Sequence, residues 1–393
     1  MGKSEQFGQK FIYFILALFF GSEVLLSSTI EKIFIWEKDS LNDAMAIITL
    51  GLLLMQIVFF QVYQIEELAL IAVVSVPIII ATINSEHNTM ISTWIFIIAA
   101  KYIDFDKAAR LSYYVELLMT LVVFYIFATG VISEYTIYRG SILRHSLGFI
   151  HPNQLGVRIF LLVVCRCYIR KDRFNYIDWG IVVGAAVFIN KVANSKTSFY
   201  ALIILAVIML VHIIMQKTGV GLESASKMLI IAAVAVNVLS LFLSFIQVKN
   251  YSLLSKFDAA MSHRFSQCHR TMAYYGVKLF GQDIQLIVNR PAIGRVYRFF
   301  LDNAYMSMVL RYGPIVFILF SGLYIWAMIM LRQMGQYALV EILCLYAIYG
   351  TMENNFFSMS QNLFLLVLSY PIYKHIEQDG KKKSLLPQIK VTW

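Results

Sequence analysis

The residues best suited to chemistry in this chain lie close together, between Arg144 and Arg158, in the stretch RHSLGFIHPNQLGVR. His151-Pro152-Asn153 has the composition of a helix start, because proline is well tolerated at the first helical position. The N–H groups at such a start have no partner within the helix and carry the positive end of its dipole. Together with Arg144, His151 and Arg158 they predict an anion site, for which a phosphate is the obvious ligand.

Arg158 lies seven residues after His151, roughly 10 Å further along the expected helix. A charge at that depth in an apolar helix usually faces a cavity or a charged partner. We expect a functional role for Arg158. A structural ion pair with Glu116 or Glu134 is the alternative.

Two further polar clusters precede or follow apolar runs. The turn Asn194–Ser198 starts such a run, where Asn or Ser is expected to cap a helix, and Ser195 and Lys196 could also contact a sugar or a phosphate. The cluster Glu353-Asn354-Asn355 is either a solvated loop or a set of hydrogen-bonding groups for a saccharide.

The composition is that of a membrane protein. Of the 393 residues, 59% are hydrophobic and 14% charged, and the mean hydropathy is +0.70. The first apolar run lacks the small-residue cleavage site of a signal peptide. We therefore expect an all-α polytopic membrane protein with about twelve transmembrane helices. The expected spans are 11–26, 41–62, 68–83, 89–100, 111–131, 153–168, 177–190, 199–215, 228–247, 314–331, 337–349 and 358–373, of which 68–83 and 89–100 could instead form a re-entrant pair.

Lysine and arginine predict the orientation, because cytoplasmic loops of bacterial inner-membrane proteins carry an excess of both. Most of those in short segments fall on the side that also holds the two termini, so both termini are expected in the cytoplasm. The stretch from Arg144 to Asn153 then faces outward. We expect one integral membrane domain over 1–393, with a large extracytoplasmic loop over 248–302 and a basic cytoplasmic tail over 374–393.

The loop over 248–302 is basic although it is expected outside, and Arg264 and Arg270 are among its cations. One explanation is that long loops cross the membrane regardless of their charge. The other is that this loop binds an anionic ligand at the membrane surface. Met272 to Phe280 and Val296 to Leu310 have the mixed apolar and basic character of interfacial helices.

A broken helix is expected where this loop returns to the membrane. Asp302 and Asn303 are suited to cap a half-helix that ends at Arg311, because Gly313-Pro314 should interrupt it before the next span. Arg311 is therefore expected to line a cavity, as Arg158 is.

Several chemistries have no support in the sequence. There is no GxxxxGK[ST] phosphate loop, no GxGxxG after a strand, no GxSxG and no HExxH motif, and the four cysteines suggest neither a disulfide framework nor a zinc site. His145, His263 and His269 show no metal-ligand spacing. The net charge of +10 is split between two sides of a membrane and does not indicate nucleic acid. We expect no metal and no cofactor.

Taken in order, these pieces resemble the bacterial polysaccharide polymerases that extend capsule, exopolysaccharide or O-antigen chains and are related to the O-antigen ligases. The matching pieces are LGFIHPNQLG at 147–156, NSKTS at 194–198, HRF at 263–265 with LFG at 279–281, LDNAY at 301–305 with RYG at 311–313, and ENN at 353–355. The family's usual Ser-Arg reads Ser195-Lys196 here, and lysine supplies a point charge in place of a bidentate fork.

The resemblance implies a metal- and nucleotide-independent glycosyltransferase that acts on the outer leaflet, with a fold similar to other lipid-linked-sugar (GT-C type) glycosyltransferases. Its donor would be a growing glycan on undecaprenyl diphosphate. Its acceptor would be one undecaprenyl-diphosphate-linked oligosaccharide repeat unit. Besides these lipids and the bilayer, flippase and chain-length regulator proteins are further candidate partners.

For this reaction, Arg158, Arg264 and Arg311 are predicted to clamp the diphosphate leaving group, and His151 or Asp302 to take the proton of the acceptor hydroxyl. Replacing Arg158 or Arg311 by alanine should abolish chain growth and leave expression intact. The predicted substrate-binding residues are Arg144, Asn153, Ser195, Lys196, Arg270, Asn303, Tyr305, Glu353, Asn354 and Asn355.

Two rival functions are considered. A ligase that moves finished glycan to another acceptor would share this chemistry and would differ in its product. A transporter or flippase for lipid-linked sugars would be expected to have inverted repeats and charges near the membrane midplane, and no repeat is visible in the sequence.

Overall fold

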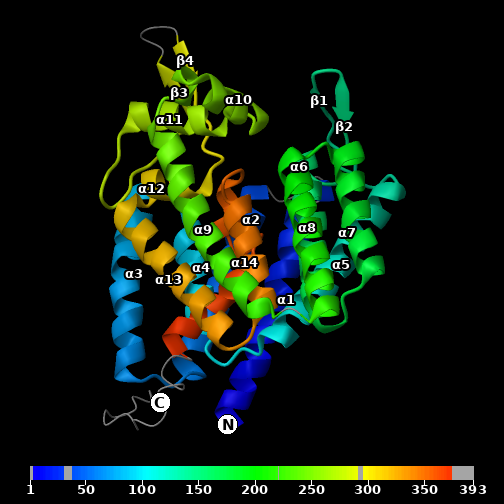
Figure 1. Ribbon diagram of the computed structural model, residues 1–393. Helices are drawn as coiled ribbons and strands as arrows, with labels where there is room; N and C mark the ends of the chain where they lie inside the picture. The colour runs from blue at the N-terminus through cyan, green and yellow to red at the C-terminus, as the bar shows by residue number, and fades with distance from the viewer. Residues whose placement is uncertain (1–2, 31–37, 220, 291–294, 374–393) are drawn as a thin grey trace.

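The computed structural model describes residues 3–30, 38–219, 221–290 and 295–373, and this part of the chain is mainly helical (Figure 1). Eight helices within it are long and apolar enough to cross a membrane. They are α1 (Lys3–Leu26), α2 (Lys38–Phe59), α3 (Ile65–Ser85), α5 (Phe105–Ala128), α7 (Tyr176–Phe188) with the π-helical turn Ile189–Ala193, α8 (Lys196–Thr218), α9 (Leu222–Phe245) and α13 (Gly313–Gln333). The expectation of an all-α polytopic membrane protein is confirmed at this level.

The remaining expected spans correspond to shorter or less apolar helical segments. Three apolar helices are short: α4 (Thr89–Ala99), α14 (Tyr337–Tyr349) and the segment Leu363–Tyr373, which begins as the 3-10 helix η7 (Leu363–Ser369). The fourth segment is α6 (Pro152–Ile169), which carries Arg158 and Arg166. Within the suggested re-entrant pair, α3 has the length of a full span and α4 about half of it.

Both β-hairpins lie at one end of the bundle, which we call the hairpin end (Figure 1). One hairpin pairs β1 (Ile137–Arg139) with β2 (Ile142–Arg144), and the other pairs β3 (Ile287–Arg290) with β4 (Arg295–Arg298), both antiparallel. The start of α1 and the last described helix lie at the opposite end. The residues 374–393, predicted as a basic tail, lie outside the described residues.

The described part of the long segment between α9 and α13 contains helices and strands, but its helices differ from those predicted. It contains η4 (Val248–Asn250), α10 (Ser252–Ala260), α11 (Arg264–Tyr275), the β3–β4 hairpin and α12 (Ala304–Arg311). The helix predicted over 272–280 is present up to Tyr275 and wrong beyond it, because α11 ends there with Gly276 as its C-cap at a φ of +70°. The predicted helix over 296–310 is wrong in its first part, because the residues up to Arg298 pair with β3.

The predicted break between α12 and α13 is present. Gly313 has a φ of +88°, which a side chain would disfavour, and Pro314 follows in the first turn of α13. Asn303 caps α12 by accepting a hydrogen bond from the Met306 N–H at 3.1 Å. Asp302, which was also expected to cap this helix, instead forms an ion pair with Arg264.

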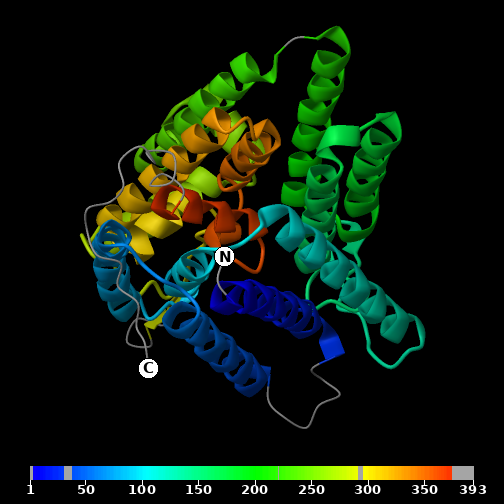
Figure 2. The ribbon, with the colours of Figure 1, turned by 90° about the horizontal axis from the view of Figure 1, so that it is seen from below.

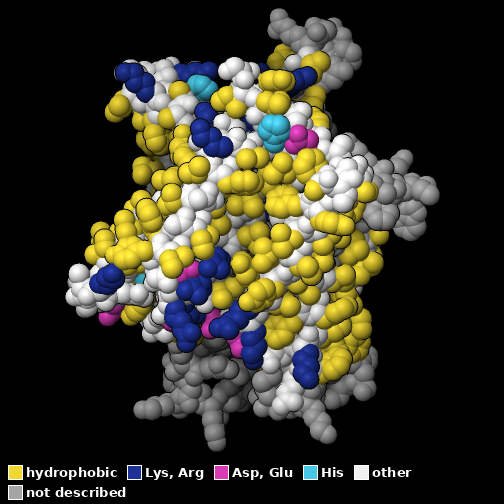
Figure 3. Space-filling model, turned by 90° about the vertical axis from the view of Figure 1, so that its right-hand side faces the viewer, with side chains coloured by type: hydrophobic (Ala, Val, Ile, Leu, Met, Phe, Trp, Pro, Cys, Tyr) yellow, Lys and Arg dark blue, Asp and Glu magenta, His cyan; other side chains and the backbone are white. Residues whose placement is uncertain are grey.

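The surface supports placement in a membrane. The face shown in Figure 3 has a broad band of hydrophobic side chains, with Lys and Arg gathered near the hairpin end and again toward the opposite end. Only 17% of the residues in the apolar windows of α2 and α9 are buried, which leaves much of these apolar helices open on the surface, as expected for helices that meet lipid. Seen from below, α1 lies between α2 and α5 and packs against both (Figure 2).

Candidate active site

The helix start predicted at His151 is present at the hairpin end. His151 Nδ1 accepts a hydrogen bond from the Asn153 N–H at 3.0 Å, and Pro152 is the first residue of α6. Arg144 lies against this start: its Nη2 donates to Asn153 Oδ1 at 2.5 Å and its Nε to the Ala193 carbonyl at 2.9 Å. Arg144 is buried, yet no carboxylate pairs with it in the described part of the chain.

The charges around the α6 start are mutually repulsive. Burial and the positive charge of Arg139 lower the pKa of Arg144 to about 10. Burial, Arg144 and Arg139 also lower the pKa of His151 below its usual 6.5. His151 is therefore neutral near pH 7, and an anion at this position would relieve the repulsion between the two arginines.

The start of α8 packs directly against α6 because residue 156 is a glycine. A Cβ at Gly156 would lie 2.8 Å from the Ser195 Cβ and 3.1 Å from the Ser198 Oγ, closer than side chains normally approach. The turn that contains these serines is also held by Arg139, whose Nη1 donates to the Asn194 carbonyl at 2.9 Å. Lys196 in the same turn is exposed. The HPNQLG and NSKTS pieces, about forty residues apart in sequence, thus form one surface.

Arg264 connects three more of the predicted pieces. It forms an ion pair with Asp302, and the charge of Glu353 also acts on it. Glu353 in turn accepts a hydrogen bond from Thr197, next to Ser198 on α8. The HRF, LDNAY, ENN and NSKTS pieces therefore meet around one arginine.

Glu353 is the half-buried acid of this group. Burial raises the pKa of Glu353 above its usual 4.5, while the charge of Arg264 and the hydrogen bond from Thr197 lower it. Burial similarly lowers the pKa of Arg264. Two carboxylates, those of Asp302 and Glu353, therefore share one arginine. We call Arg264, Asp302, Glu353 and Thr197 the Arg264 cluster.

Asn303 and Tyr305 are buried beneath this cluster. Asn303 Nδ2 donates to Ser240 Oγ at 2.6 Å and to the Thr351 carbonyl at 3.2 Å, and the Tyr305 hydroxyl donates to the Ala347 carbonyl at 2.6 Å. With these bonds they fix α12 and the loop that carries Glu353. Both side chains therefore hold the backbone around the site in place, whereas the sequence predicted that they would contact the substrate.

Arg311 lies apart from Arg264, at the crossing of two chain segments. A Cβ at Gly281 would lie 2.0 Å from the Arg311 carbonyl oxygen, so the LFG and RYG pieces meet through their backbones. The Arg311 Nε is buried and has no hydrogen-bond partner among the residues that the structure describes. The titratable side chains near Arg311 are Asp283 and His87. Burial and the charge of Arg311 lower the pKa of His87. His87 was not singled out in the sequence; its position in the short turn after α3 was the available signal.

The other predicted residues have local roles or lie at the edge of the site. Arg270 is exposed, and its Cζ lies 5.7 Å from the centroid of the Phe299 ring. Asn354 is half-buried in the 3-10 helix η6 (Asn354–Phe357), and the side chain of Asn355 lies outside the described residues. Of the loop histidines, His145 pairs with Glu134 at 2.9 Å. No group of three His, Cys, Asp or Glu in the described ranges could hold a metal ion.

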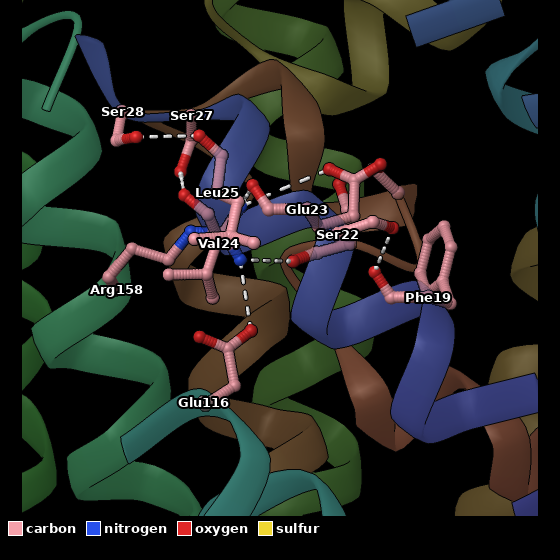
Figure 4. A network of polar contacts seen from close by, with 11 residues as sticks. Phe19, Ser22, Glu23, Val24, Leu25, Ser27, Ser28, Glu116 and Arg158 are labelled. Atoms are coloured by element: carbon pink, nitrogen blue, oxygen red, sulfur yellow. Dashed lines mark hydrogen bonds and ion pairs between the residues drawn. The ribbon is translucent and has the colours of Figure 1, made fainter. Parts of the chain in front are cut away.

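Arg158 points toward α1 and α5, where it contacts Glu23 and Glu116 (Figure 4). Its Nη1 lies 2.9 Å from Glu116 Oε1, and both side chains are almost completely buried. Its Nη2 donates to the Glu23 carbonyl at 3.1 Å and lies 3.9 Å from the Glu23 carboxylate. Of the two ion pairs considered from the sequence, the one with Glu116 is confirmed and the one with Glu134 is wrong.

A cavity of about 490 Å³ lies on this side of α6. Its walls come from α1, α2, α4, α6 and the segment 358–361, and Arg158 and Glu23 are among its lining residues. Hydroxyl and amide side chains are frequent in the lining. They are Ser22, Ser27, Asn42, Thr49, Asn88, Thr89, Ser92, Thr93, Gln154, Ser358, Ser360 and Gln361.

This cavity was not predicted from the sequence, apart from Arg158. A signal was present, because each of the contributing apolar stretches contains polar residues about one helical turn apart, such as Asn88 and Ser92 on α4. Which of these helix faces lie against one another is determined only by how the helices pack in the bundle. The α6 helix separates the cavity from the α8 contact, with Gln154 and Arg158 on one side and Gly156 on the other.

Comparison with known proteins found no matching family model, no matching curated protein and no matching solved structure. The function must therefore be argued from the site itself.

Proposed function

We propose that this protein is a membrane glycosyltransferase that polymerises undecaprenyl-diphosphate-linked oligosaccharide repeat units on the outer leaflet of a bacterial plasma membrane. The observation that carries the proposal is the meeting of polar pieces from α8, α11, the start of α12 and the loop after α14 around Arg264, with the start of α6 packed against that of α8. The proposal includes about twelve membrane-crossing segments, both termini in the cytoplasm, the hairpin end outside, and a fold of the GT-C type.

The cations of the hairpin end suit a diphosphate leaving group. As the bond between the anomeric carbon and the phosphate oxygen breaks, negative charge grows on the diphosphate. Arg144 and Arg139 have no carboxylate partner in the described chain. The start of α8, which no side chain caps within that part of the chain, packs against the start of α6 and adds the positive end of its helix dipole. We assign the leaving group to these arginines, with Arg264 beside it. Arg158 is already neutralised by Glu116, so it is a weaker candidate for this role than it was from the sequence.

The proton of the acceptor hydroxyl needs a base. Glu353 and Asp302 both lie beside Arg264, and the raised pKa of Glu353 makes its carboxylate a better proton acceptor than an exposed glutamate. His151 is less suited than the sequence suggested, because its Nδ1 already accepts a backbone hydrogen bond. In this scheme the acceptor oxygen bonds to the anomeric carbon, the diphosphate leaves with the bonding electrons, and a carboxylate of the Arg264 cluster takes the proton.

Two rivals remain to be tested. A ligase would use the same groups with a different acceptor. A transporter of lipid-linked sugars is favoured by one observation, the buried Arg158–Glu116 pair next to a polar cavity. The product of the reaction separates all three functions.

The deciding experiment is incubation of the purified protein with one lipid-linked repeat unit and no nucleotide. A ladder of lengthened glycans is expected, and Arg264→Gln should remove it. Arg332→Gln is the matched control, because Arg332 pairs with Glu223 (2.9 Å) near the opposite end of α13. A single transfer to a different acceptor would indicate a ligase. If the cognate repeat unit is left unchanged by folded protein, the glycosyltransferase proposal is wrong.

A further inference from the structure

The cavity between α1, α2, α4 and α6 contains polar side chains that the fold does not use. Asn42, Thr49, Asn88, Ser92 and Gln154 line it, and none of their side chains makes a hydrogen bond within the described part of the chain. Thr49 is the most informative of them, because it is 5% exposed and its hydroxyl has no hydrogen-bond partner among the described residues. A polar group buried in this way costs free energy unless a ligand or water completes its hydrogen bonds.

The charges of the lining exclude a diphosphate. The charged side chains that line the cavity are Glu23, Asp43 and Arg158, and Arg158 is already paired with Glu116 behind the wall. The cavity therefore has an excess of negative charge. A diphosphate would be repelled here, whereas a neutral ligand, or one that carries an amine, would not be.

The shape and the walls of the cavity suit a saccharide. A volume of about 490 Å³ is within the range of small-molecule sites and is large enough for a short oligosaccharide. Phe19 and Phe96, with ring centroids 4.6 Å apart, form an apolar patch in the wall. The hydroxyls and amides match the hydroxyls at the edge of a sugar ring, and the aromatic patch matches its apolar face.

Glu23 is the strongest hydrogen-bond acceptor in this lining. Its side chain is 35% exposed, although α1 lies inside the bundle. The carboxylate lies 3.9 Å from the Arg158 guanidinium (Figure 4) and accepts a hydrogen bond from Ser360. Both contacts fix the carboxylate in position and leave part of it facing the cavity.

We propose that this cavity binds a neutral or amine-bearing saccharide, with Glu23 accepting a hydrogen bond from a sugar hydroxyl and with Asn42, Thr49 and Ser92 binding further hydroxyls. If the protein is the proposed polymerase, this saccharide is a non-reacting part of the acceptor repeat unit, whose reacting hydroxyl lies beside the Arg264 cluster, and only that identification rests on the proposed function. The diphosphate then binds on the other side of α6, near Arg144.

The test measures occupancy of the cavity without any reaction. All four native cysteines are buried, so Ser92→Cys supplies a reactive thiol in the cavity of the otherwise complete protein. Labelling of this thiol by a maleimide is followed with lactose, cellobiose or chitobiose present, and separately with farnesyl diphosphate. At least one disaccharide should slow labelling by about tenfold at about ten times its dissociation constant, as mass action requires. Farnesyl diphosphate should have no effect.

Variants show which residues are responsible for the protection. Glu23→Gln and, if that variant does not fold, Thr49→Val should weaken protection at a fixed sugar concentration. Glu66→Gln, an exposed acid in the first turn of α3, is the matched control and should leave protection unchanged. Protection by farnesyl diphosphate alone, or the same labelling rate with every sugar, would overturn the proposal. Protection by a sugar in a protein that forms no glycan ladder would support the cavity and reject the polymerase.

Discussion

At the scale of single residues, Arg158 shows how a buried charge depends on its partner. The side chain is 2% exposed and is held by Glu116, which is itself 1% exposed. Removing one partner of such a pair leaves the other charged and desolvated, at a cost of about 3–5 kcal/mol, whereas replacing both with apolar residues is often nearly neutral. The sequence alone suggested that Arg158→Ala would affect only activity. The contact with Glu116 predicts a loss of stability as well.

We therefore expect Arg158→Ala to lower the thermal stability of the detergent-solubilised protein and its abundance in the membrane. The double variant Arg158→Met with Glu116→Leu should recover most of the stability. Fluorescence-detected size-exclusion chromatography after heating measures both. Arg332→Ala, which breaks a more exposed ion pair worth about 0–1 kcal/mol, is the control. An Arg158→Ala protein as stable as the parent would show that the buried pair contributes nothing.

Glu353 permits a prediction about pH. Its pKa is raised by burial and lowered by the Thr197 hydrogen bond, so removing that hydroxyl should raise the pKa further. If the ionised carboxylate is the base, activity falls as the pH drops through its pKa. Thr197→Val should then move the acid side of the pH–rate profile to higher pH. Thr218→Val, at the far end of α8, should leave it in place. An unchanged acid side in Thr197→Val would argue against Glu353 as the base.

At the scale of elements, the site depends on the contact between the starts of α6 and α8. An alanine at position 156 would gain about 1 kcal/mol of helix propensity, but its Cβ would lie 2.8 Å from the Ser195 Cβ. Overpacking of this kind costs about 1–3 kcal/mol, so the clash outweighs the gain. The two helix starts would be pushed apart and the predicted diphosphate site would widen.

Gly156→Ala should accordingly reduce glycan transfer more than it reduces stability. Gly180→Ala on α7, where an added Cβ would meet nothing within 4 Å, is the matched control and should be neutral or slightly stabilising. Initial rates and melting temperatures of both variants are the measurements. Equal rates for the two variants would mean that close packing of α6 on α8 is not needed for the reaction.

At the scale of the whole molecule, the hairpin end and the opposite end must face different compartments. Orientation from the Lys and Arg distribution predicts that Lys278 faces outward and Arg173 faces the cytoplasm. Both positions are exposed, and the native cysteines are buried. In intact cells, a membrane-impermeant maleimide should label Lys278→Cys at once and Arg173→Cys only after permeabilisation. The reverse pattern would place the Arg264 cluster in the cytoplasm and would exclude an outer-leaflet reaction.

Local features were predictable from the sequence because they depend on neighbouring residues. The apolar helices, the start of α6 at Pro152, the Asn303 cap and the break at Gly313-Pro314 all follow from residues a few positions apart. The helix predicted over 272–280 is wrong only in its second part, also for a local reason, since α11 ends before Gly276, earlier than the apolar pattern indicated.

Only the tertiary structure decided which side chains meet. Arg158 pairs with Glu116 and not with Glu134. Asp302 was expected to cap a helix but forms an ion pair with Arg264. The proposed saccharide cavity is lined by four helices and a loop near residue 360. The physical reason is the distance along the chain over which each feature is determined. A helix start or a break depends on backbone geometry over one or two turns, whereas the partner of a buried charge depends on which helix faces pack together across hundreds of residues.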